Sequence, residues 1–320
     1  MRFQRLRRVL LAATCVASLL SACGGGGDVV SKFTPGRLVT FGDAFSDVGQ
    51  RAGVQYTANV SPTNWSQVVA AAYGLPLAPS SAGGTSYAIG SARVSATPDA
   101  QGNAATPTIA MQVDAFLAAG GPQAPDAILV QGGVADLIAE GKRELDGLQD
   151  GATTTANVAA AGTALGNQVR RLVNAGAKHV IVLGAYNLGR TPWATSRNAN
   201  ARLETLTNRF NDSLLVSIVD LGSNVLYVDT ALLFNLVTAN PATYGYDNIT
   251  TPLCTTVDPG PGDGIGIGPN QVNSTLCRTA TDLNATLVPG TTLYADPVYF
   301  TPPAHTTLGQ LVADRLRNRF

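Results

Sequence analysis

Short apolar runs alternate along the chain with segments whose apolar residues recur at helical spacing. The runs are long enough for buried strands and lie at residues 38–41, 128–130, 180–183 and 225–228. The segments between and after them resemble amphipathic helices, with apolar side chains every three or four positions in residues 65–72, 158–172, 203–214 and 308–316. This alternation predicts an α/β fold in which helices cover both faces of a central parallel sheet.

Length and charge limit the function classes. The 320 residues are 45% hydrophobic, which is enough to bury one large core. Basic and acidic side chains number 21 each, without a basic stripe, so we expect no nucleic-acid partner. Two histidines and no cysteine cluster give little support to a metal site, and we expect no cofactor. The oligomeric state stays open.

The N-terminus resembles a bacterial export signal. Four arginines within residues 2–8 precede an apolar run, residues 9–20, that is shorter than the roughly 20 residues of a membrane span. Residues 20–23 read LSAC and resemble a lipobox, which implies cleavage before Cys23 and lipidation of its thiol. Ordinary cleavage that leaves Cys23 unmodified is the alternative.

These features predict the organisation of the chain. Residues 1–22 are expected to be a signal peptide, residues 23–36 a lipidated cysteine with a flexible tether, and residues 37–320 one domain. Gly24 after the lipid position favours anchoring at the outer membrane, on a side that the sequence does not specify. In that oxidising compartment we expect Cys254 and Cys277 to form a disulfide, with two free buried thiols as the alternative.

Local residue patterns predict one helix start and two loops. Asn64 and Gln67 have the spacing of a capping box at a helix start. Residues 78–105 and 257–270 are rich in glycine, serine, alanine or proline and are expected to be loops.

Residues 41–49 read FGDAFSDVG and resemble the first block, F-G-D-S-x-S-D-x-G, of the SGNH/GDSL hydrolase family. In that family the serine is the nucleophile at a strand-to-helix turn. Here Ala44 takes its position, and an alanine side chain cannot attack an ester. The acids of the block, Asp43 and Asp47, have the structural role of holding the turn in the family.

Three further stretches resemble the later blocks of the family. Residues 83–93 match the second block, which implies that the Gly90 N–H is an oxyanion donor. Residues 133–136 read GVAD where the family has G-x-N-D, so Ala135 takes the place of the asparagine. Residues 296–301 read DPVYFT where the family has D-x-x-H-P-T, so Asp296 matches the acid and Tyr299 takes the place of the histidine.

The resemblance covers residues 37–318 and implies a flavodoxin-like three-layer α/β/α SGNH-hydrolase fold. It also implies that the three positions that carry the chemistry hold other residues. The backbone N–H groups of Ala44 and Gly90 do not depend on side chains. We therefore expect the cleft at the family's catalytic position, which we call the old cleft, to bind a small acyl or carboxylate ligand, or a partner.

Two other functions remain open. The chain is a working carboxylic-ester hydrolase (esterase or lipase) if Ser46 and His305 form a substitute pair beside Asp296. Against this, Ser46 is expected to cap a helix start, and both His305 and His179 are expected to be structural. A purely structural envelope protein would have its cleft filled by Tyr299 and neighbouring side chains.

Overall fold

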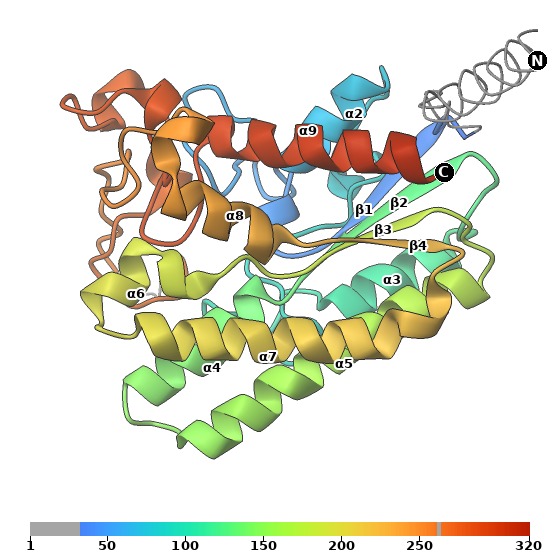
Figure 1. Ribbon diagram of the computed structural model, residues 1–320, viewed down its shortest axis with the longest axis horizontal. Coiled ribbons are helices and arrows are strands. Elements are labelled where there is room, and N and C mark those ends of the chain that lie inside the picture. Colours follow the sequence, from blue (N-terminus) through green and yellow to red (C-terminus); the bar gives the residue numbers. More distant parts are fainter. Residues whose placement is uncertain (1–32, 261–263) are drawn as a thin grey trace, which may run out of the picture. The chain divides into compact units, whose positions relative to one another are not determined.

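Four parallel strands lie at the centre of the described part of the chain, residues 33–260 and 264–320 of the computed structural model (Figure 1). They are β1 (Arg37–Phe41), β2 (Asp126–Gln131), β3 (Val180–Leu183) and β4 (Val225–Val228), and they pair side by side in that order. Each neighbouring pair is parallel. The expected parallel sheet is confirmed, whereas the expected signal peptide and Cys23 lie outside the described residues.

The burial of the strands explains their composition. β2 and β3 are buried along their whole length, and β1 is buried beyond its first residue. A sheet covered on both faces needs apolar side chains at successive positions, not only at alternate ones. β4 pairs on one side only, and its two central residues are partly exposed.

Helices cover both faces of the sheet (Figure 1). On one face lie α2 (Trp65–Ala72), α8 (Thr230–Ala239) and α9 (Pro302–Arg319). On the other lie α3 (Ile109–Ala118), α4 (Val134–Leu145), α5 (Gly151–Asn174) and α7 (Asn200–Ile218). The expected three-layer α/β/α fold is therefore confirmed. Within the segments described, no helix has both the length and the hydropathy that crossing a membrane requires.

Short helical turns connect these elements. They are α6 (Pro192–Ser196) and the 3₁₀ turns η1 (Ala44–Ser46), η2 (Ser80–Ala82), η3 (Leu188–Arg190), η4 (Val219–Leu221), η5 (Pro241–Tyr244), η6 (Ser274–Leu276), η7 (Ala280–Asp282) and η8 (Pro289–Thr291).

The start of α2 confirms the capping box. The Asn64 side chain accepts the backbone N–H groups of Ser66 and Gln67, and the Gln67 side chain accepts the N–H of Asn64 at 3.0 Å. Two helices were missed in the sequence, α3 and α8. For α3 a signal was present, since Thr108 caps it and Ile109, Val113 and Phe116 recur at helical spacing on its buried side.

The loop of residues 78–105 extends the sheet beyond β1. Thr40 donates its N–H to the carbonyl of Thr85 at 3.1 Å and accepts the N–H of Tyr87 at 2.7 Å. Ile89 then donates to the carbonyl of Gly42 at 3.2 Å. These bonds bring Gly90 next to the end of β1, where the site residues gather.

Two glycines let α5 and α7 approach closely. A Cβ on Gly162 would overlap the carbonyl oxygen of Phe210, and a Cβ on Gly166 would overlap the hydroxyl of Ser217. Both glycines are buried, so the backbones of the two helices pack at these positions without intervening side chains.

We expect Gly162→Ala to lower the free energy of unfolding by about 1–3 kcal/mol, because overpacking against a rigid backbone outweighs the roughly 1 kcal/mol gain in helix propensity. Urea unfolding measures this. Thr163→Ala, at an exposed position of the same helix, is the control and should be neutral or stabilising. Equal stability of both variants would contradict the close approach.

Candidate functional site

The turn after β1 is held by the buried carboxylate of Asp43. Its Oδ1 accepts the N–H of Phe45 at 3.0 Å, which caps η1, and its Oδ2 accepts the N–H of Ala135 at 3.2 Å. Burial raises the pKa of this carboxyl to about 6, although the two N–H donors favour its charged form. Asp43 therefore links the turn to the start of α4.

Asp47 holds the next part of the same turn. Its Oδ1 accepts the N–H groups of Gly49 and Gln50 at 2.8 and 2.7 Å, and its Oδ2 accepts the N–H of Gly90 at 2.7 Å. Burial raises the pKa of this carboxyl to about 6 as well. The Gly90 N–H, expected to face a ligand as an oxyanion donor, is instead directed at a side chain of the protein itself.

The side chains at the three expected catalytic positions are almost completely buried. Ala44 begins η1 and is 3% exposed, and Ala135 in the first turn of α4 and Tyr299 before α9 are both 0% exposed. Burial raises the pKa of the Tyr299 phenol well above its usual value, so this group does not act as a base near neutral pH.

Aromatic side chains pack behind the turn, in a group that we call the aromatic cluster: Phe45, Tyr186, Tyr299, Phe300 and His305. Within it, the Phe45 ring lies 5.1 Å from Tyr186 and 4.9 Å from His305, measured between centroids. Tyr186 is anchored by a 2.8 Å hydrogen bond from its hydroxyl to the carbonyl of Val298. All five side chains are essentially buried.

Tyr56 covers the remaining side of the site. Its ring contacts Tyr299 in a T-shaped arrangement with centroids 5.2 Å apart, and a Cβ on Gly90 would overlap its phenol. Tyr56 is 8% exposed and Gln101 donates to its hydroxyl at 3.3 Å. The rings of Tyr56 and Tyr299 thus lie side by side next to Gly90, where the acyl or carboxylate ligand was expected.

The Asp296 carboxylate accepts hydrogen bonds from backbone N–H groups. Its Oδ1 accepts the N–H groups of Val298 and Tyr299 at 2.8 and 2.7 Å, and its Oδ2 accepts the N–H of Ser274 at 3.3 Å. The residue is fully buried, which raises the pKa of its carboxyl to about 6. The acid that the resemblance assigns to orienting a histidine therefore shapes a turn here.

Ser46 does not pair with His305 in the described structure. The Ser46 hydroxyl donates to Oε1 of Gln131 at 2.9 Å and accepts the indole N–H of Trp65 at 3.1 Å. Asp43, not Ser46, caps η1, so the capping role expected for Ser46 is wrong. Its hydroxyl instead joins β2 to α2.

His305 is buried in the first turns of α9. Its Nδ1 has no hydrogen-bond partner among the described residues, and its ring packs on Phe45 and Phe300. Desolvation lowers the pKa of its imidazole to about 3, so the neutral ring fills space in the core. His179 packs likewise, stacked on Phe33 with centroids 3.4 Å apart.

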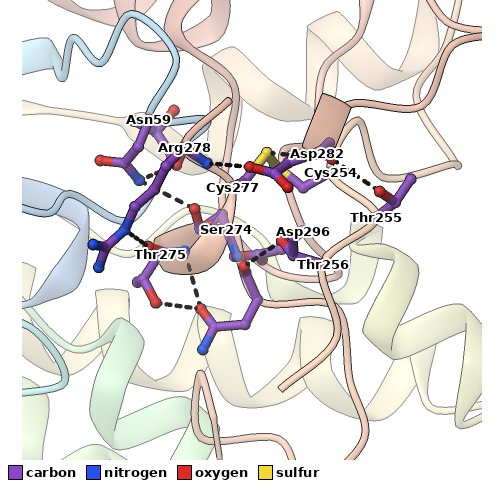
Figure 2. The surroundings of a disulfide bond; sticks show 12 residues. Asn59, Cys254, Thr255, Thr256, Ser274, Thr275, Cys277, Arg278, Asp282 and Asp296 are labelled. Carbon is purple, nitrogen blue, oxygen red and sulfur yellow. Dashed lines mark hydrogen bonds between the residues drawn. A yellow bond between two sulfur atoms is a disulfide. The ribbon is translucent and has the colours of Figure 1, made fainter. Parts of the chain in front are cut away.

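The expected disulfide between Cys254 and Cys277 is present (Figure 2). It lies in a small apolar cluster with Ala58, Leu253 and Ala295. The N–H of Cys254 donates to Ala295 at 2.9 Å, and the carbonyl of Cys277 accepts from Asn59 at 2.8 Å. The bridge therefore ties the loop of η6 to the turn that carries Asp296.

Several residues that shape the site were missed in the sequence. Tyr56 and Gln131 contribute through contacts with segments far away in the chain, and neither lies in a recognisable motif. Across the described ranges, no group of three or more histidine, cysteine, aspartate or glutamate side chains could hold a metal ion.

Comparisons with known proteins agree with this architecture. A family model described as GDSL-like Lipase/Acylhydrolase matches residues 38–312. The chain belongs to this family.

More specific relatives are distant. A Pseudomonas putida protein named "Uncharacterized protein in trpE-trpG intergenic region" is 24% identical over an alignment of 266 residues, and the match covers 75% of this chain and 43% of that protein. Thus the chain spans less than half the length of this relative. Two crystal structures align at 14% identity with TM-scores of 0.44, covering 89% and 88% of this chain and 97% and 96% of theirs, and they add nothing to the assignment.

We expect His305→Leu to remove a pH dependence of stability. Below pH 6.5 the unfolded chain protonates His305 while the folded chain keeps it neutral down to about pH 3, so the wild type loses stability as the pH falls. Urea unfolding should show the variant gaining about 2 kcal/mol on the wild type between pH 7.5 and pH 5.

Thr306→Val is the matched control in the same helix, and its difference from the wild type should not change with pH. If the difference for His305→Leu is equally constant, His305 is not held neutral in the folded state.

Proposed function

We propose that this chain is a GDSL-fold protein that does not hydrolyse esters and that acts at the cell envelope by binding. The observation that carries the proposal is the fate of the Gly90 backbone N–H, which is one of the two expected oxyanion donors. It donates to the buried carboxylate of Asp47. An oxyanion hole needs donors directed at the developing charge of the substrate, and this one points into the protein.

The side chains support the same proposal. Ala44 offers no nucleophile, and the Tyr299 phenol is buried with its pKa raised. Losing the serine or histidine of such a triad costs a serine protease about a millionfold in turnover. The nucleophile, the base and one amide donor are all lacking at the expected positions. We therefore expect no ester hydrolysis from the residues at these positions.

The competing function, ester hydrolysis through Ser46 and His305, has little geometric support. Ser46 is engaged by Gln131 and Trp65, and the low pKa of buried His305 makes it a weak base. A purely structural role is compatible with the filled cleft. It differs from our proposal in predicting no ligand.

The envelope location rests on the sequence of the N-terminus. Residues 1–22 have the pattern of a signal peptide, and Cys23 follows a lipobox-like LSA. We include lipidation of Cys23 and attachment to the outer membrane in the proposal. A single buried acyl chain binds a membrane only marginally, whereas a lipoprotein anchor with several chains is stable.

The absence of hydrolysis is tested with the purified chain and nitrophenyl esters of short and medium chain length. We expect the rate to equal that of the buffer and to be unchanged by Ser46→Ala or His305→Ala. The triple variant Ala44→Ser, Ala135→Asn, Tyr299→His serves as the comparison, because any rate that it gains would come from the restored chemistry. Turnover by the unmodified chain that either single alanine variant abolishes would refute the proposal.

Lipidation is tested by metabolic labelling with an alkyne fatty acid during expression in a Gram-negative host. We expect label in the wild type and its complete loss in Cys23→Ser, together with a shift from the membrane fraction to the soluble periplasmic fraction. Cys15→Ser is the matched control and should keep both label and location. Label that persists in Cys23→Ser would contradict the anchor.

A further inference from the structure

An open cavity lies immediately outside Tyr56. Its volume is about 340 Å³, which is at the lower end of the range for small-molecule sites. The turn after β1 lines one part of it with Asp47, Arg51 and Tyr56, and the loop held by the disulfide lines another with Thr275 and Arg278. Tyr56 thus separates this cavity from the aromatic cluster, since its ring also contacts Tyr299.

Two arginines in this cavity form no salt bridge within the described ranges, although burial, which raises the pKa of the nearby Asp47 carboxyl, is partly offset by the charge of Arg51, which favours the charged form of that carboxyl. Arg51 donates to the hydroxyl of Thr106, and Arg278 donates from Nε to the carbonyl of Thr275 at 3.3 Å. Several other arginines of the chain are paired with acids, as in the bonds from Arg37 to Asp126 and from Arg202 to Glu144. Both cavity arginines therefore keep guanidinium N–H groups available for a ligand.

The two acids in the cavity wall are already engaged. Both oxygens of Asp47 accept backbone N–H groups. Asp258 accepts the N–H of Gly260 at Oδ1 and the side-chain amide of Asn273 at Oδ2. Each acid thus has hydrogen-bond partners on both oxygens, whereas the arginines have most of their donors unused. The cavity consequently offers more donors than acceptors to an occupant.

We propose that this cavity binds a small oxyanion, a carboxylate or a phosphate group, between the guanidinium groups of Arg51 and Arg278. A guanidinium presents its donors in a planar fork that matches the oxygens of either group. The polar side chains of Gln101 and Thr275 in the same wall suit hydroxyl groups on the rest of the molecule.

This inference deepens the proposed function, on which it rests, because it gives the binding role a place and a ligand class. It also places the expected carboxylate ligand outside the old cleft, on the solvent side of Tyr56. The disulfide supports the arrangement, since Arg278 directly follows Cys277 and the bridge fixes the loop that carries it.

The test is isothermal titration of the purified full chain in detergent with citrate and with inorganic phosphate. We expect a Kd of about 1 mM or tighter for at least one of them, and weaker binding in high salt because exposed charges are screened. Arg51→Gln and Arg278→Gln should each weaken binding at least tenfold. Arg209→Gln, at an exposed position of α7, is the matched control and should change the Kd less than twofold.

Tighter binding of citrate would assign the site to carboxylates, and tighter binding of phosphate would assign it to phosphate esters. Absence of binding of both anions, or equal binding by Arg51→Gln, Arg278→Gln and the wild type, would overturn the proposal. No ester is present in this titration, so its failure leaves the absence of hydrolysis untouched. Conversely, turnover in the ester assay would refute the proposed function without changing the titration result.

Discussion

Two buried carboxylates, Asp43 and Asp47, hold together the segments that meet at the end of β1. Asp43 connects the turn to α4 through the N–H of Ala135, and Asp47 connects it to the loop that extends the sheet through the N–H of Gly90. An unpaired buried N–H costs about 1–3 kcal/mol, and a buried carboxylate without donors costs more. The acids and the loops therefore stabilise one another. The side chains that pack around the end of β1 are positioned by these hydrogen bonds.

The same arrangement explains why the site is closed. The hydrogen bonds of the turn use backbone groups and the two acids, so the side chains of Ala44, Ala135 and Tyr299 are free to be apolar or aromatic without disturbing it. Tyr299 fills the space on one side and Tyr56 covers Gly90 on the other. Under the proposed function, the chain has the fold of the family, but the side chains at the family's catalytic positions are part of the hydrophobic core.

In the proposed site, the polar and charged groups that would bind a ligand lie in the outer cavity and not at the family's catalytic position. The interior face of Tyr56 meets the aromatic cluster, while its outer side borders a cavity with two arginines whose donors are largely unused. A buried charge needs partners, whereas an arginine at an open cavity keeps its hydration until a ligand replaces it. Binding at this place would therefore be compatible with a packed and dry former cleft.

The sequence by itself determined the alternation of strands and helices, the capping box at Asn64, and the family blocks with their unusual residues, because these depend on neighbours in the chain. It also limited the disulfide to Cys254 and Cys277. Only the tertiary structure decided that the Gly90 N–H is used by Asp47, that Tyr56 covers Gly90, and that Arg51 and Arg278 line the same cavity. These outcomes join residues far apart in the chain, and no local pattern encodes which buried donor will face which acceptor.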